Sequence, residues 1–142
     1  MKNTFILLAL LASLSIAAFA QDRLPPTRRT FQPSPHLMAV ADTDDAAGLA
    51  QTPFGYVIPL QGDPVPAQST VGIFGRHLLG SGASKVLLWS DSDILVLEAQ
   101  VARNPFPGLE MITFHLPASV HGEVWVTVAG RRASNTVRII VE

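Results

Sequence analysis

The stretch MITFHLPASVHGEVWVTVAGRRASNTVRIIV, residues 111–141, decides the fold. Apolar and polar residues alternate along three runs within it, and a period of two is typical of β-strands with one buried face. Pro117, Gly122 and Gly130 stand between the runs and favour turns. We therefore predict three strands that share one buried face. The side chains expected in the core are Ile112, Phe114, Leu116, Val124, Val126, Val128, Val137, Ile139 and Val141.

Short apolar runs of the same kind continue upstream, separated by Gly, Pro, Asn and Asp. Parallel strands need crossovers of a dozen or more residues, and no convincing amphipathic helix lies between these runs. The sequence thus predicts an all-β fold, a single antiparallel β-sandwich of about seven strands over residues 53–142. The predicted strands are residues 56–60, 70–74, 85–89, 94–102, 111–116, 123–129 and 136–141.

The chain begins with the pattern of a cleavable secretory signal, residues 1–20. Lys2 supplies the positive start, an apolar run follows, and cleavage is expected after Ala20. That run is too short for a membrane span, so we expect none once the signal is removed. Residues 21–52 are predicted to be a largely irregular, Pro-rich leader. The expected location is secreted or periplasmic, in either case extracytoplasmic.

The composition of the chain excludes several kinds of stabilising bond and several classes of partner. The chain has no Cys, so disulfides and a cysteine-linked lipid are ruled out. Its formal net charge is -1, which provides no field that would attract nucleic acid. Apolar residues make up 48% and charged residues 15%, a balance that favours a well-buried β protein held together by packing.

No catalytic, cofactor or metal site is predicted. The chain lacks a Gly-x-Ser-x-Gly elbow and a phosphate-binding loop followed by a helix. Its four histidines, His36, His77, His115 and His121, lack the spacing of a zinc site. The acidic group Asp42, Asp44 and Asp45 lacks the Gly and Glu of a calcium loop and is better explained by solubility or helix capping. A small hydrolase with dispersed carboxylates is the least favoured class, its candidates being Asp91, Asp93, Glu98 and Glu110.

Trp125 is the most informative single residue, because alternation directs it outward between Val124 and Val126. An outward Trp can stack on a sugar ring or anchor a protein partner, although packing under Arg138 is the simpler explanation. Aligned inward faces would put Trp125 opposite Ile140, with Arg138 diagonal to it. Trp89, at the end of a predicted strand, is expected to pack. The predicted interaction surface is Trp125, Arg138 and His115.

Several segments together resemble a known family. These are VGIFG at 71–75, FPGLEMITFHLP at 106–117, VTVAG at 126–130 and ASNTV at 133–137. In order and spacing they resemble the immunoglobulin-like, IPT/TIG-like β-sandwich domain found near the C-termini of secreted proteins of soil bacteria. Residues 90–93, Ser-Asp-Ser-Asp, depart from the Gly-rich turn usual in that family. The resemblance implies an immunoglobulin-like sandwich and a structural or binding role, without enzymatic activity.

We therefore expect a secreted, non-enzymatic immunoglobulin-like binding or assembly module at the cell envelope or outside the cell. Its expected partner is an envelope or extracellular protein. The alternative is a carbohydrate-binding module in which Trp125 is the stacking residue. Neither alternative includes a cofactor or nucleic acid.

Overall fold

The structure is a computed structural model. It describes residues 33–52, 55, 57–60, 62–103 and 106–142. The predicted signal peptide, residues 1–20, and the first part of the predicted leader, residues 21–32, lie outside the described residues.

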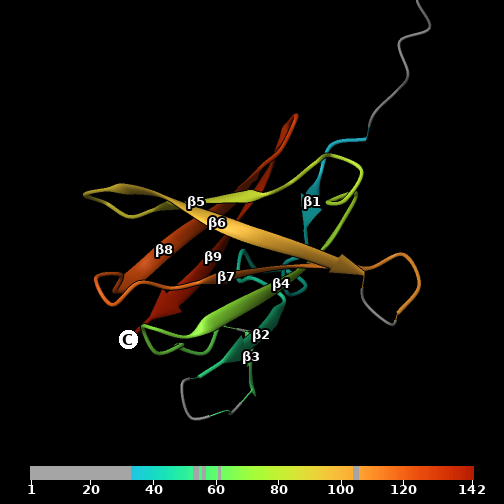
Figure 1. Cartoon of the computed structure of the whole chain (residues 1–142). Helices are drawn as coiled ribbons and strands as arrows, with labels where there is room; N and C mark the ends of the chain where they lie inside the picture. The colour runs from blue at the N-terminus through green and yellow to red at the C-terminus, as the bar shows by residue number, and fades with distance from the viewer. Residues whose placement is uncertain (1–32, 53–54, 56, 61, 104–105) are drawn as a thin grey trace, which may run out of the picture. The chain divides into compact units, whose positions relative to one another are not determined.

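Every regular element among the described residues is a β-strand (Figure 1). The strands are β1 (His36–Leu37), β2 (Gly48–Gln51), β3 (Val57–Leu60), β4 (Thr70–Arg76), β5 (Lys85–Trp89), β6 (Ile94–Arg103), β7 (Glu110–His115), β8 (Gly122–Ala129) and β9 (Ala133–Val141). The predicted strands correspond to β3 through β9, and the all-β class is confirmed. Within the described part of the chain, no helix is long and apolar enough to cross a membrane.

The strands follow one hydrogen-bonded path, β3-β2-β4-β7-β6-β5-β8-β9, and β1 pairs with β4. Every pair of named strands is antiparallel. β6 divides the path, because residues 94–98 pair with β5 and residues 99–103 pair with β7. Figure 1 shows this long strand crossing from one group of strands to the other. We call β3-β2-β4-β7 the first half-sheet and β5-β8-β9 the second half-sheet.

Inward side chains from both half-sheets form one hydrophobic core. All the residues predicted for that core from the last three strands are buried. On the opposite face of β8, Thr127 is buried as well, although alternation directs its polar side chain away from the core. Its Oγ1 lies 2.9 Å from the Oγ1 of Thr136 on β9. The two hydroxyls satisfy each other, which makes the burial of Thr127 tolerable.

Residues 33–52 differ from the largely irregular leader that the sequence predicted, because β1 and β2 join the first half-sheet. Leu37 and Ala50 are fully buried there. A Cβ at Gly48 would lie 2.0 Å from the Gly72 carbonyl oxygen, so only glycine allows β2 to approach β4 this closely. Strands of two and four residues are too short to show alternation, which is why sequence patterning did not reveal them.

β9 ends the strand path, yet its outer edge is covered by segments from the N-terminal part of the chain. The Arg138 N–H donates to the Asp44 carbonyl at 2.7 Å, and the Ala46 N–H donates to the Arg138 carbonyl at 2.8 Å. Further along, the Val65 N–H donates to the Ile140 carbonyl at 2.8 Å. These bonds form two parallel bridges that leave little of the β9 edge open.

A side chain extends this covering where the backbone does not reach. The Asn135 Oδ1 accepts a hydrogen bond from the Leu37 N–H at 2.7 Å, and its Nδ2 donates to the Leu37 carbonyl at 2.9 Å. The amide of Asn135 thus pairs with Leu37 as a neighbouring strand would. It links β9 to β1, which lies 98 residues earlier in the sequence.

We expect Asn135→Ala to lower the free energy of unfolding by about 1–3 kcal/mol, because it leaves two backbone groups of the buried Leu37 without partners. Urea denaturation followed by circular dichroism measures this loss. Arg132→Ala, at the exposed tip of the β8–β9 hairpin, is the control and should leave stability unchanged. Equal stability of the two variants would contradict the role of the Asn135 amide.

Candidate interaction surface

Trp125 on β8 lies directly opposite Arg138 on β9. The predicted register, with Trp125 opposite Ile140, is wrong, because Ile140 lies opposite Glu123. Aligning the inward faces fixes the register only to a multiple of two residues. The short turn after β8 and an irregularity beside it set the actual register.

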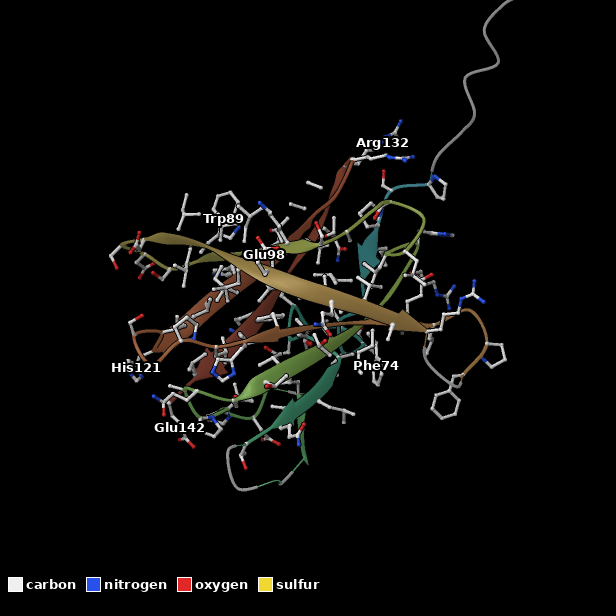
Figure 2. The ribbon with its side chains drawn as sticks, viewed as in Figure 1. Phe74, Trp89, Glu98, His121, Arg132 and Glu142 are labelled. Atoms are coloured by element: carbon white, nitrogen blue, oxygen red, sulfur yellow. The ribbon has the colours of Figure 1, made fainter. Side chains whose placement is uncertain are left out.

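A second tryptophan continues the same row. Trp89 on β5 is the cross-strand partner of Trp125 on one side and of Ile94 on the other. Figure 2 shows the Trp89 side chain projecting outward from β5. The ring was expected to pack, but the residue is 42% exposed. Both tryptophans of the chain therefore lie on the outer side of the second half-sheet.

Aliphatic side chains widen this row into a continuous patch. Ile94 and Val96 on β6 are 56% and 53% exposed, and Val96 lies opposite Leu87 on β5. Leu87 and Trp125 are half-buried between their neighbours. We call these side chains the outer apolar face: Leu87, Trp89, Ile94, Val96 and Trp125. Contiguous exposed apolar patches are uncommon on soluble proteins and mark interaction sites.

Charged groups border the outer apolar face along the strands. At one end the Lys85 Nζ lies 3.6 Å from the Glu98 Oε1, in an ion pair between β5 and β6. At the other end, the turn between these strands carries Asp91 and Asp93, both exposed. An apolar centre with a polar border is the usual anatomy of a protein interface.

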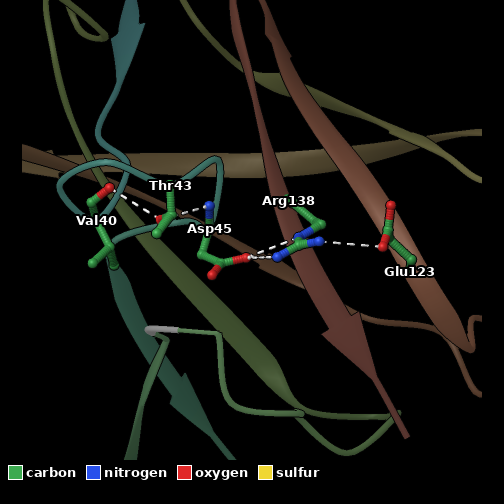
Figure 3. Close-up of polar contacts among 5 residues, drawn as sticks. All are labelled: Val40, Thr43, Asp45, Glu123 and Arg138. Atoms are coloured by element: carbon green, nitrogen blue, oxygen red, sulfur yellow. Dashed lines mark hydrogen bonds and ion pairs between the residues drawn. The ribbon is translucent and has the colours of Figure 1, made fainter.

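Arg138 is held in an ion-pair network (Figure 3). Its Nε and Nη2 donate to the Asp45 Oδ1 at 2.8 and 2.6 Å, and its Nη1 donates to the Glu123 Oε2 at 3.4 Å. The hydrogen bonds that Arg138 donates to Asp45, together with the negative charge of Asp45, raise the pKa of the Arg138 guanidinium. Because Asp45 and Glu123 already hold the guanidinium, Arg138 anchors the loop before β2 on β9. Arg138 therefore has a structural role beside the outer apolar face, because its guanidinium is already hydrogen-bonded to Asp45 and Glu123.

His115 belongs to a different part of the molecule. It ends β7 in the first half-sheet and lies opposite Thr70 of β4. Its Nδ1 is 3.5 Å from the Thr70 Oγ1. The structure therefore brings Trp125 and Arg138 together, whereas His115 lies on the other half-sheet.

A hollow of about 420 Å³ lies at the end of the second half-sheet, where the inward-facing Leu88, Leu95 and Val124 contribute to its lining. The β5–β6 turn and the β7–β8 loop enclose it. The polar residues that line it include Ser90, Asp91, Asp93, His121 and Glu123. None of the five side chains of the outer apolar face lines it.

The four carboxylates considered for hydrolysis do not form one group, because Asp91 and Asp93 line the same hollow whereas Glu110 lies far from it. Asp93 immediately precedes β6, and Glu110 lies opposite Arg103 at the other end of that ten-residue strand, about 30 Å away. Glu110 accepts hydrogen bonds from the backbone N–H groups of Leu78 and Leu79. Among the described residues, no three acidic or histidine side chains group closely enough to hold a metal ion.

Sequence reasoning missed Ile94, Val96 and the exposure of Trp89. Residues 94–97 read Ile-Leu-Val-Leu, so no polar residue indicates which face of the strand meets water. The one feature of the sequence that pointed to this surface was the apolar run at residues 94–97, which ends at the charged Glu98. Among the described strands, β6 has a paired neighbour on one side only at these residues, a property of the topology that the sequence pattern does not reveal.

Comparison with models of protein families, with curated proteins and with solved structures found no match for this chain.

We expect the two tryptophans to differ in access to solvent, with Trp89 more exposed than Trp125. Trp125→Phe leaves Trp89 as the only tryptophan, and Trp89→Phe leaves Trp125. Acrylamide should quench the fluorescence of the first variant more strongly, and its emission should lie at longer wavelength. Equal quenching of the two variants would contradict the exposed position of Trp89.

Proposed function

We propose that this chain is a secreted, non-enzymatic binding or assembly module that acts at the cell envelope or outside the cell. The outer apolar face is the observation that carries this proposal. Its two most exposed aliphatic side chains, Ile94 and Val96, stand beside Trp89 on a rigid pair of strands. Burying these apolar side chains against a partner removes them from water and stabilises the complex. In the isolated chain their exposure makes no contribution to the stability of the fold.

The finer fold that we propose is an immunoglobulin-like β-sandwich of the IPT/TIG type. Two half-sheets that bury their inner faces in one core support it. The family resemblance of residues 71–75 and 106–137 supports it as well. Domains of this architecture commonly act through a sheet face or through loops, which agrees with the position of the outer apolar face.

A protein partner fits this surface better than a sugar. Ile94 and Val96 offer no hydrogen bond to a hydroxyl-rich ligand, and they occupy the most exposed part of the face. Aromatic residues inside an apolar centre are the groups that most often dominate protein interfaces. For a chain expected to be exported, the partner would be another envelope or extracellular protein.

Carbohydrate binding is the second candidate, and the pairing of Trp89 with Trp125 favours it. Two neighbouring indole rings can stack on sugar rings. The β5–β6 turn at the end of the face carries the exposed Ser90, Asp91 and Asp93, whose hydroxyl and carboxylate groups can bond sugar hydroxyls. Under this alternative Trp89 would be a stacking residue together with Trp125.

Two substitutions separate these candidates. Trp89→Ala removes an aromatic ring, and Ile94→Ser removes only aliphatic surface. For a protein partner we expect both variants to bind about tenfold or more weakly, because both lose buried apolar area. For a sugar we expect only Trp89→Ala to lose binding. Chemical cross-linking of exported proteins to the purified chain, and a glycan array, are the two assays.

Thr113→Ala, on β7 of the first half-sheet, is the control for both assays and should bind like the unaltered chain. Circular dichroism must show that each variant is folded. Binding that survives both Trp89→Ala and Ile94→Ser would exclude the outer apolar face as the binding surface.

A further inference from the structure

The arginines that form no ion pair with a described residue gather around one loop of the molecule. Of the other described cationic side chains, Lys85 pairs with one carboxylate and Arg138 with two. The arginines without an ion pair are all exposed. We call them the basic end: Arg76, Arg103, Arg131 and Arg132.

The loop that follows β4, residues 77–82, links the parts of the basic end. Arg76 is the last residue of β4 and leads into this loop. Near the other end of the loop, the Arg131 N–H donates to the Ser81 carbonyl at 2.9 Å, so the tip of the β8–β9 hairpin contacts the loop. Figure 2 shows Arg132 at that tip. Guanidinium groups from β4 and from the β8–β9 hairpin thus border the same loop.

A hollow of about 590 Å³ opens beside this loop, with Arg76, His77 and Arg103 in its lining. Arg103 is the last residue of β6, so two strands that are not neighbours each contribute a guanidinium. The carboxylate in the described lining is that of Glu110, which accepts hydrogen bonds from two backbone N–H groups of the loop. These bonds already stabilise its negative charge. The guanidinium groups are therefore the charges of the hollow that still lack a partner among the described residues.

Phe106 adds an aromatic ring to the lining of the same hollow. At 67%, it is the most exposed of the large apolar side chains that the structure describes. A guanidinium binds the paired oxygens of a carboxylate through two parallel hydrogen bonds, and an aromatic ring can stack on a sugar ring. A ligand that uses both kinds of group carries carboxylates on sugar rings.

We propose that the basic end binds an acidic polysaccharide whose sugar rings carry carboxylates. One charged sugar would occupy the hollow, with its carboxylate between Arg76 and Arg103 and its ring against Phe106. The guanidinium groups of Arg131 and Arg132 would meet carboxylates further along the same polymer. A repeating anion fits this arrangement better than a single small ion, because the positive charges come from several strands on both sides of the loop.

This binding site is separate from the outer apolar face, and no residue belongs to both. The inference goes beyond the proposed function, because it gives the chain a second contact, with an anionic polymer. It holds whether the outer apolar face binds a protein or a neutral sugar.

The test is isothermal titration calorimetry of the purified chain with polygalacturonate as the probe. We expect binding at low salt that weakens as sodium chloride screens the charges. The double variant Arg76→Gln and Arg103→Gln should raise the dissociation constant about tenfold or more, since it removes both forks that hold the carboxylate. The double variant Arg131→Gln and Arg132→Gln should raise it about threefold, since those side chains lie outside the hollow. All four side chains are exposed, so the variants should stay folded, which circular dichroism checks.

Lys85→Gln is the matched control for Arg103→Gln, because each removes one positive charge from an exposed side chain. Lys85 lies beside the outer apolar face and is paired with Glu98. It should be dispensable for binding, whereas Arg103→Gln should weaken binding severalfold. Equal losses in the two variants would show that binding follows net charge alone and would overturn the site.

Polyphosphate separates recognition of a sugar from plain attraction of charge, because it is an anionic polymer without sugar rings. Phe106→Ala should weaken binding of polygalacturonate about threefold or more and leave binding of polyphosphate unchanged. Equal effects on the two polymers, or tighter binding of polyphosphate, overturn the assignment to a polysaccharide. Tighter binding of dextran sulfate than of polygalacturonate overturns the assignment to carboxylates.

A chain that binds no polygalacturonate at low salt overturns the proposal as a whole. Trp89→Ala, which removes a ring of the outer apolar face, should bind polygalacturonate normally. Failure of the basic end and failure of the outer apolar face are therefore distinguishable.

Discussion

The ion pair between Asp45 and Arg138, with the backbone bonds on either side of it, joins the beginning of the described chain to its last strand. Without these contacts the outer edge of β9 at Arg138 would present unpaired backbone groups, and the loop before β2 would lose its attachment to β9. Asn135 extends the same junction to Leu37. Residues 33–52 are therefore an integral part of the fold, and the arrangement of β1 and β2 depends on a strand at the far end of the sequence.

β6 sets the other main constraint, because it pairs with β5 along its first part and with β7 along its second part. A strand shared in this way links the two half-sheets covalently and lets one core extend under both. Among the described strands, residues 94–97 then pair with a neighbour on one side only. The unpaired side of these residues borders the outer apolar face, to which Ile94 and Val96 belong.

The later strands were predictable because their side chains alternate strictly, so that Val124, Val126 and Val128 identify the inner face without ambiguity. The contacts of the N-terminal part were not predictable. β1 has two residues, and β2 depends on a close approach at Gly48 that becomes apparent only once Gly72 is known to lie against it. In the candidate surface, the alternation of side chains correctly directed Trp125 outward. Which residue of β9 lies opposite Trp125 depends on the β8–β9 register, and the hairpin turn sets that register. Trp89 and Val96 were missed because exposure along an uninterrupted apolar run is decided by which strands lie beside it.

The bond between Asn135 and Leu37 has a kinetic consequence. It closes a loop of 98 residues, and contacts of such long range form slowly because the entropy of closing the loop must be overcome first. The sheet cannot be completed until the last strand has emerged from the ribosome. A fold whose final pairing awaits the last of its strands therefore stays incomplete until nearly the whole of the described sequence is available.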